Sequence, residues 1–253
     1  DAIEEVASRE RLSLCMTNVL RPEFEIFSET GRRHYTSTSL PSLCSLDICY
    51  NSFDEYVAHL RSFSRNRARS VQKEQRRCER FGVTIEKLTE PGAIQDTLHQ
   101  LADRHWSRHN GSGFHFRPSL FSKVKEYLGD AARIYIAKSD TRVIGFSMVL
   151  QKGGVAYGLE VGVEEDQGRE GAVYFNLCFY QPIKDAIAEG LRRIYFGRGV
   201  PQVKLRRGCQ VQDVFLFYRA TSQVRTHLLR PWFQVHETWT RHKGRKLERM
   251  VMG

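Results

Sequence analysis

Runs of apolar and β-branched residues predict three consecutive β-strands in the middle of the chain. They cover residues 131–138, 143–150 and 155–163, and a polar turn and a glycine pair separate them. Turns this short connect antiparallel neighbours. The pattern therefore predicts two successive β-hairpins in one sheet.

The segments after these strands alternate between loop and regular structure. Residues 164–172 are charged and contain glycine, residues 173–190 have a helical pattern, and residues 194–196 form a short apolar strand. A basic loop bounded by glycines follows at residues 198–208. Pro182 lies within the helical stretch, where it is expected to kink or break the helix.

The N-terminal part carries several short periodic segments. Residues 1–9 have a helical pattern, residues 11–20 are predicted as a strand, residues 23–29 continue with strand-like alternation, and residues 46–49 are apolar. Together they predict part of a mixed sheet. We assign residues 1–50 to a reduced N-terminal subdomain.

A long helix is predicted over residues 51–81, from an N-cap at Ser52 to a stop at Gly82. Within it, residues 61–80 hold eight lysines and arginines against two glutamates, which gives six of the ten net positive charges. One face of this helix carries Arg65, Arg69, Lys73, Arg76 and Arg80. Like charges at this spacing repel each other. The face is a candidate track for phosphate groups, and the alternative is a helix whose arginines pair with acidic residues elsewhere.

Two amphipathic helices are predicted next, at residues 95–109 and from Pro118 to Gly129. His105 lies on the apolar face of the first of them and is interpreted as a packed side chain rather than a catalytic one. Residues 211–220 are predicted as a strand near the sheet edge. The remaining residues form a C-terminal basic segment.

Composition and charge restrict the class of protein. The chain has 253 residues, of which 41% are hydrophobic and 27% charged, and this excludes a disordered chain. The net charge of +10 and a pI of about 9.5 favour a polyanionic partner, such as tRNA, a nucleotide carrier, a phosphopantetheine thioester or anionic lipid. The alternative is a basic surface that is only solvated.

The six cysteines include no C-x-x-C pair and have no histidine at metal-ligand spacing. This pattern is typical of reduced thiols in the cytosol and indicates neither disulfides nor a zinc site. No apolar run is long enough to span a membrane, no signal peptide is visible, and the first residue is Asp rather than Met. We expect a cytoplasmic enzyme without a metal.

The order of these elements resembles that of the GNAT acyltransferase superfamily. Residues 173–208 resemble its FemAB-like, peptidoglycan-biosynthesis-type branch, with an aromatic-rich helix, a short strand, and then a lysine and an Arg-Gly pair in the phrase KLRRG. The resemblance includes the arginine-rich helix and covers about residues 47–218. It implies an α/β (α+β) fold with a GNAT-like mixed, mostly antiparallel central sheet flanked by helices. The domains would be a basic helical arm at 51–82, an acyltransferase domain at 83–225 and a basic segment at 226–253.

The resemblance also implies a reaction. An activated acyl group would pass to an amine of a small molecule or peptide and form an amide, with no tightly bound cofactor. Aminoacyl-tRNA is the favoured donor, and coenzyme A or carrier-protein thioesters are the alternative donors. A different class of protein is a catalytically silent module that binds RNA or another anion.

In several GNAT enzymes a glutamate on the third central strand acts through water as the general base, and here the resemblance places Glu160 in that role. Burial would raise its pKa toward a useful range, whereas an ion pair with an arginine such as Arg198 would make it structural. Gly158 and Gly162 on the same strand would let the backbone approach a ligand.

The resemblance further assigns catalytic positions to Asn176 and Tyr180, because a tyrosine on this helix can protonate the leaving group. A core-facing tyrosine is the alternative. His109 and His115 would border the acceptor side of the fold.

The donor would be held by a loop at a helix N-terminus, a place that suits anions. Glu170 occupies the position of the first glycine of the family's cradle, and Glu164, Glu165 and Asp166 crowd its approach, which disfavours coenzyme A. A lysine and an arginine of the later basic loop would contact phosphate. The predicted donor-binding residues are Gln167, Gly168, Arg169, Gly171, Ala172, Lys204 and Arg207.

Overall fold

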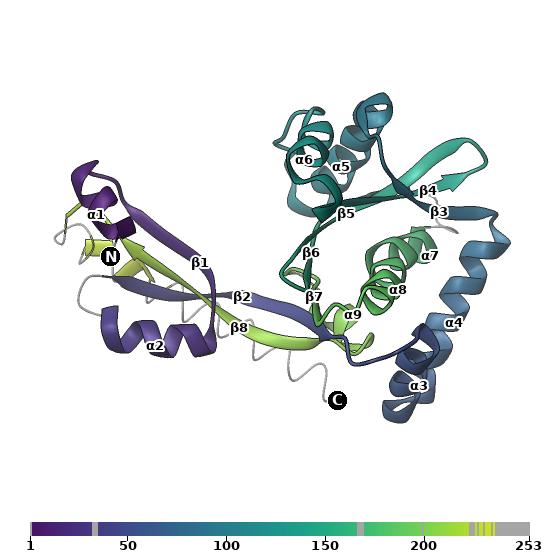
Figure 1. Cartoon of the computed structure of the whole chain (residues 1–253), viewed down its shortest axis with the longest axis horizontal. Helices are drawn as coiled ribbons and strands as arrows, with labels where there is room; N and C mark the ends of the chain where they lie inside the picture. Colours follow the sequence, from purple (N-terminus) through teal and green to yellow (C-terminus); the bar gives the residue numbers. More distant parts are fainter. Residues whose placement is uncertain are drawn as a thin grey trace. The chain divides into compact units, whose positions relative to one another are not determined.

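In the computed structural model, the three strands predicted in the middle of the chain are antiparallel neighbours (Figure 1). β4 (Ala132–Ser139) pairs with β5 (Arg142–Lys152), and β5 pairs with β6 (Val155–Val163). β3 (Val83–Leu88) pairs with the other edge of β4. The predicted hairpins are confirmed.

The chain consists of two compact units. The first comprises Asp1–Cys44, Arg198–Leu205 and Gln210–Gly253, and the second comprises Ser45–Gly197 and Arg206–Cys209. The predicted strand at 211–220 therefore lies in the same unit as the N-terminal strands, and not in the unit that holds most of residues 83–225. The structure describes residues 2–31, 35–165, 170–198, 200–222, 226, 228–229, 231–233 and 235.

In the second unit, β6 changes its neighbours along its length. β7 (Arg193–Tyr195) pairs in parallel with the start of β6, and the last of the three pairs joins Tyr157 to Tyr195. The other edge of β7 pairs with the last residues of β2, Ser45–Asp47. Beyond Tyr157, β6 continues to Val163 beside β5, whereas the ladder to β7 has ended. The third predicted strand therefore parts from the short strand near residue 194 after Tyr157.

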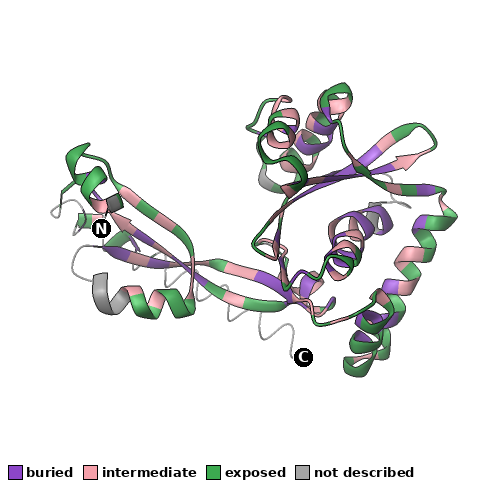
Figure 2. Ribbon diagram, in the orientation of Figure 1, coloured by how far each residue is buried: buried purple, intermediate pink, exposed green. Residues whose placement is uncertain are grey.

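Helices cover both faces of the sheet of the second unit (Figure 1). One face carries α5 (Gln95–Asn110) and α6 (Leu120–Leu128), with 3₁₀ turns at Gly92–Ile94 and Gly129–Ala131. The other face carries α7 (Glu170–Phe175), a π-helical turn (Asn176–Tyr180) and α8 (Gln181–Ala188). Buried residues run along the strands and along the adjacent helices (Figure 2).

The predicted long basic helix is two helices, α3 (Phe53–Phe63) and α4 (Arg65–Arg80). Ser64 between them has an extended backbone, with φ of −164° and ψ of 127°, and this interrupts the helical hydrogen bonds. α4 packs on α7 and the π-helical turn through a face that includes the buried residues Ala68 and Val71. None of the helices in the described part of the chain is long and apolar enough to cross a membrane.

The π-helical turn explains how a proline fits inside a helix. Pro182 has no N–H to donate and its ring crowds the preceding turn. The N–H of Gln181 donates to the carbonyl of Asn176, five residues earlier, so the turn is widened just before the proline. The Asn176 amide donates to the Ala172 carbonyl at 2.7 Å. The expected kink is therefore one widened turn, and the helix continues as α8.

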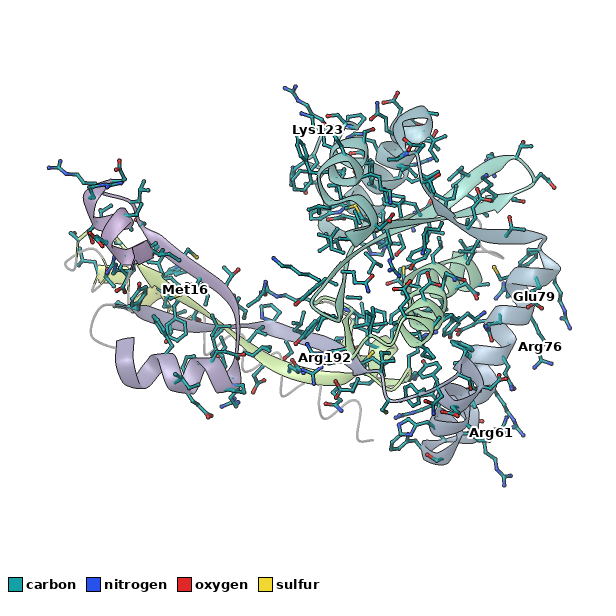
Figure 3. The ribbon with its side chains drawn as sticks, in the orientation of Figure 1. Met16, Arg61, Arg76, Glu79, Lys123 and Arg192 are labelled. Carbon is teal, nitrogen blue, oxygen red and sulfur yellow. The ribbon has the colours of Figure 1, made fainter. Side chains whose placement is uncertain are left out.

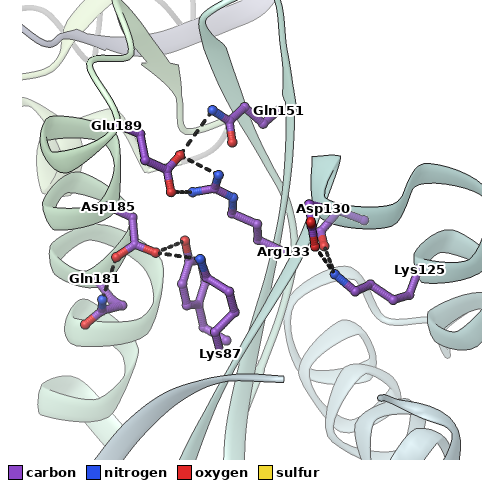
Figure 4. A network of polar contacts seen from close by, with 10 residues as sticks. Lys87, Lys125, Asp130, Arg133, Gln151, Gln181, Asp185 and Glu189 are labelled. Atoms are coloured by element: carbon purple, nitrogen blue, oxygen red, sulfur yellow. Dashed lines mark hydrogen bonds and ion pairs between the residues drawn. The ribbon is translucent and has the colours of Figure 1, made fainter. Parts of the chain in front are cut away.

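A polar network fixes α8 on β4 (Figure 4). The Tyr135 hydroxyl donates to Asp185 at 2.8 Å, and Arg133 of the same strand pairs with Glu189, just after α8. Lys87 of β3 also pairs with Asp185 at 3.5 Å. Because α8 is held at two points one turn apart, this helix has a defined orientation on the sheet.

The first unit contains β1 (Leu14–Leu20), β8 (Gln210–Arg219) and most of β2 (Thr36–Asp47), in the order β1-β8-β2. Its helices are α1 (Ala2–Arg9), α2 (Arg21–Gly31) and the short α9 (Pro201–Leu205) within the predicted basic loop.

The strand-like alternation predicted at 23–29 is wrong, because these residues form part of α2. Phe24 and Phe27 lie three residues apart on one face of this helix. Their rings pack on Phe215 and Phe217 of β8, with centroid distances of 3.9 Å for Phe24–Phe215 and 4.7 Å for Phe27–Phe217. Packing of these two half-buried rings on β8 favours the helical spacing over the strand spacing.

Candidate active site

Glu160 lies on β6, just past the point where β6 and β7 part. Met148 of β5 is opposite Glu160, whereas the next residue, Val149, is opposite Gly158, so Leu159 is the extra residue of a β-bulge. Bulges bend a strand and re-aim its side chains. The bulge thus directs Glu160 toward α5.

On that face, the indole Nε1–H of Trp106 donates to Oε2 of Glu160 at 2.9 Å. The carboxylate is half-buried, and no ion pair to it occurs within the described residues. Arg198, the partner considered from sequence, belongs to the first unit, where its guanidinium donates to Asn18. Glu160 is therefore held by a neutral donor and not by a cation.

This environment changes the acidity of Glu160. Burial raises the pKa of its carboxyl group above the ordinary value, and the hydrogen bond from Trp106 offsets part of that rise. A carboxylate with a raised pKa accepts a proton more readily at neutral pH than an ordinary surface glutamate. The chemistry of a general base is therefore available at this position.

The histidines considered from sequence lie near the same helix. The exposed His115 ring is 5.9 Å from the Trp106 ring. His109 lies against His105, with ring centroids 4.4 Å apart, and burial together with His109 and Arg108 lowers the pKa of His105 to about 4. Of these histidines, His115 is the one that contacts the residue holding Glu160.

The two glycines that were expected to let a ligand approach the backbone differ in the space beside them. A Cβ on Gly162 would lie 2.5 Å from the backbone carbon of Leu101, so α5 packs directly on the backbone of β6 there. At Gly158 the nearest atom is the Tyr195 carbonyl oxygen, 3.5 Å from the Cβ position. Gly162 is a helix-packing position, and this corrects the expectation.

Asn176 and Tyr180 lie on the opposite face of the sheet from Glu160, in a buried cluster with Glu74 of α4 and Arg207. The Tyr180 hydroxyl donates to the Glu74 carboxylate and accepts from Arg207 Nε at 3.2 Å. Arg207 pairs with Glu74 at 2.7 Å and stacks 3.6 Å from the Phe175 ring centroid. The Asn176 amide donates to the Glu74 carbonyl at 3.2 Å.

These contacts favour structural roles for the three predicted residues in the cluster. Tyr180 is 1% exposed, and burial raises the pKa of its hydroxyl, which opposes proton release. Arg207 is 6% exposed and its charge is balanced by Glu74, so it does not present a free cation to a phosphate. The cluster fixes α4 to the π-helical turn. Glu74 was not singled out from sequence, because in sequence it is one glutamate in a basic helix.

The structure describes only part of the predicted donor loop. Gln167, Gly168 and Arg169 lie outside the described residues, as does Asp166. Gly171 and Ala172 lie in α7, so the loop leads into a helix as predicted. The carboxylates of Glu164 and Glu165 pair with Arg142 and Arg108, at 2.9 and 2.6 Å, which balances the negative charge that was expected to disfavour an anion.

Lys204 lies in α9 of the first unit. It is buried, and its Nζ donates to the carbonyl of Arg198 at 2.7 Å. This bond fixes the turn before α9. The ammonium group therefore has a structural partner of its own within the first unit.

The structure places the predicted basic residues on one helix, α4. We define the basic face of α4 as Arg65, Arg69, Lys73, Arg76 and Arg80. All five side chains are exposed. No ion pair to a carboxylate involves any of them in the described part of the chain, and Arg76 donates instead to the Gln72 carbonyl at 3.2 Å. Figure 3 shows Arg76 pointing outward from the helix. Among the described residues, no acidic side chain neutralises this face.

No metal site accompanies these features in the residues described, since no three histidine, cysteine, aspartate or glutamate side chains among them are placed to hold an ion.

Comparison with known proteins gives one family. The FemAB-like family, described as peptidoglycan biosynthesis/recognition, matches residues 2–251. No curated protein matches the chain.

Several solved structures share the fold at low sequence identity. L-PGS from Bacillus licheniformis is 14% identical with a TM-score of 0.63, over 91% of this chain and 76% of that one. FemX is 12% identical with a TM-score of 0.64, over 94% and 77%. The C-terminal domain of a putative lysylphosphatidylglycerol synthetase from Agrobacterium fabrum is 13% identical with a TM-score of 0.58, over 85% and 70%.

Proposed function

The chain belongs to the FemAB-like family, and on this premise we propose that it is a GNAT-type acyltransferase that transfers an aminoacyl group from aminoacyl-tRNA to an amine. The amine nitrogen attacks the ester carbonyl, an amide bond forms, and the bond to the tRNA ribose oxygen breaks. The amine gives up a proton and the departing ribose oxygen gains one.

The main observation in support of tRNA as the donor is the basic face of α4. Its five cations span the 16 residues of α4, or about 22 Å along the helix. They repel one another by a few tenths of a kcal/mol per neighbouring pair, and no carboxylate of the described residues relieves this. A row of unneutralised cations on a rigid helix is suited to a nucleic-acid backbone, whose binding is driven by counterion release.

Glu160 is proposed as the base that takes the proton from the amine, directly or through water. Trp106 holds Oε2, and Oε1 has no hydrogen-bond partner among the described residues. The substrate proton would therefore go to Oε1. The raised pKa of the carboxyl group supports this role, because the base must take up a proton during the reaction.

The acceptor is proposed to be a peptide amine of a cell-wall precursor, which accords with the family description. One similar structure carries the name putative lysylphosphatidylglycerol synthetase. A phospholipid headgroup is therefore the alternative acceptor to compare with the peptide amine.

The test is incubation of the protein with charged tRNA and a stem peptide bearing a free amine, with phosphatidylglycerol vesicles or acyl-CoA in parallel reactions. Loss of the aminoacyl ester together with amide formation is the expected result. Transfer from acyl-CoA alone would overturn the proposed donor. If the protein binds RNA but transfers no aminoacyl group, the proposed catalysis is overturned.

Binding is tested with the charge-reversed triple Arg69→Glu, Lys73→Glu and Arg76→Glu. We expect weaker tRNA binding, with the log–log salt slope reduced by about one for each phosphate that is no longer neutralised. The matched control reverses Arg104, Lys123 and Lys152, which are exposed on the same unit. Arg104 donates to the carbonyl of Gln100 at 3.3 Å, as Arg76 does to that of Gln72. Equally weakened binding in both triples would remove the basic face as the tRNA site.

A further inference from the structure

The joint between α3 and α4 carries an exposed aromatic side chain at one end of the basic face. Phe63 is the last residue of α3 and is 63% exposed. Ser64 follows it in extended conformation, and α4 begins at Arg65. The phenyl ring therefore stands at the N-terminal end of α4, and most of its surface is exposed.

Two further side chains border this ring. The exposed His59 lies edge-on to it, with ring centroids 4.8 Å apart at 88°, and the Arg67 guanidinium carbon is 5.9 Å from its centroid. His59, Phe63 and Arg67 follow one another at four-residue spacing across the helix joint. No carboxylate in the described residues pairs with Arg67 or with His59.

We propose that Phe63, with Arg67 and His59, is a stacking site for an unpaired RNA base. This inference rests on the proposed function. It specifies that the protein binds an unpaired part of the RNA near the basic face. Aromatic side chains and arginine planes both stack on bases, whereas a base inside a duplex is already stacked and is not available. A phosphate of the same strand would be neutralised by Arg67, which lies beside the ring.

The surroundings favour RNA over a membrane surface. A membrane-binding helix presents several large apolar side chains opposite its basic face. Over α3 and α4, Phe63 is the one large apolar side chain that is exposed, and Tyr56, Val57, Leu60 and Val71 are buried. One aromatic ring among cations suits a nucleotide, which offers one base for each phosphate.

The test compares Phe63→Ala with the wild-type chain for binding to tRNA, a single-stranded oligoribonucleotide and a blunt RNA duplex. We expect affinity for tRNA and for the single strand to fall about 5- to 140-fold, as for the removal of one base stack, with unchanged duplex binding. The salt slope should stay the same, because every phosphate keeps its cation. Phe63→Trp should retain the affinity, and its fluorescence should be quenched by RNA.

The matched control is Tyr127→Ala, which removes another exposed aromatic ring from the same unit and should change nothing. Unchanged single-strand affinity in Phe63→Ala would overturn the inference, and so would an equal fall in duplex affinity. Weaker binding to phosphatidylglycerol vesicles with RNA binding intact would assign Phe63 to a membrane surface instead. If tRNA binding depends on the basic face but not on Phe63, the proposed function stands and this inference fails.

Discussion

The indole of Trp106 on α5 donates a 2.9 Å hydrogen bond to the carboxylate of Glu160 on β6. A cationic partner would hold the pKa of a half-buried glutamate low, whereas a neutral donor leaves much of the effect of burial in place. The bulge at Leu159 and the parting of β6 from β7 put this pair where one strand edge is no longer covered by its neighbour. A base that is oriented but not neutralised is what amide formation from an amine requires.

Glu160→Gln should lower kcat by about 10²–10⁴-fold with little change in KM, because proton uptake belongs to the transition state. The amide keeps the shape of the side chain and can still accept the Trp106 hydrogen bond, so folding should survive. The rate of aminoacyl transfer is measured as the single-turnover loss of the aminoacyl ester from charged tRNA. Glu126→Gln, on the exposed side of α6, is the control. Full kcat across neutral pH would make Glu160 a structural residue.

Trp106→Phe should move the acidic limb of the kcat/KM profile to higher pH. Burial raises the pKa of Glu160 and the indole hydrogen bond lowers it, so removal of that bond raises the pKa further. Because the base acts in its ionised form, activity then falls off at a higher pH on the acid side. The shift should vanish in the Glu160→Gln background. A uniformly lower profile without a shift would show that Trp106 contributes packing alone.

Tyr180→Phe should reduce stability by about 1–2 kcal/mol and leave kcat unchanged. The hydroxyl is a buried link between Glu74 and Arg207, and its removal leaves both with one hydrogen bond fewer. Denaturant unfolding and the ester-loss assay separate the two effects. A large fall in kcat at unchanged stability would restore the role of leaving-group acid that the sequence suggested.

Glu74→Ala should cost about 3–5 kcal/mol, because it leaves the Arg207 guanidinium buried without its counterion. Glu79→Ala removes the same side chain from an exposed position on the same helix and should lie within about 0.5 kcal/mol of wild type. Urea unfolding of both variants gives the comparison. Equal stability would mean that the buried pair adds nothing net, and that α4 is held by its apolar face.

Gly162→Ala should destabilise the second unit by about 3 kcal/mol, because the new methyl group would meet the backbone of Leu101 at 2.5 Å. Relief requires α5 to move away from β6, and Trp106 moves with it, so kcat should fall as well. Gly92→Ala, whose Cβ would meet the nearest atom at 3.9 Å, is the control. Thermal unfolding and kcat of the two variants test this.

Local sequence patterns determined most of the fold. The hairpins β4-β5-β6 follow from short turns between apolar runs, and the ends of α5 and α6 follow from glycine and proline punctuation. The exposure of the basic face of α4 also follows from spacing, since a helix places residues three and four apart on one side. These features depend on neighbours within a few residues, so the sequence carries them directly.

Tertiary structure decided the parts that depend on distant partners. The residues at 23–29 form a helix because their phenylalanines meet β8, which lies far along the chain. The family resemblance assigned Tyr180 and Arg207 to chemistry, yet Glu74, 106 and 133 residues away, engages both of them in a buried cluster. Glu160 was found from its strand, but its donor Trp106 lies 54 residues away on α5. Burial and hydrogen bonding are set by such contacts, and pairing over these separations leaves no periodic signal in the chain.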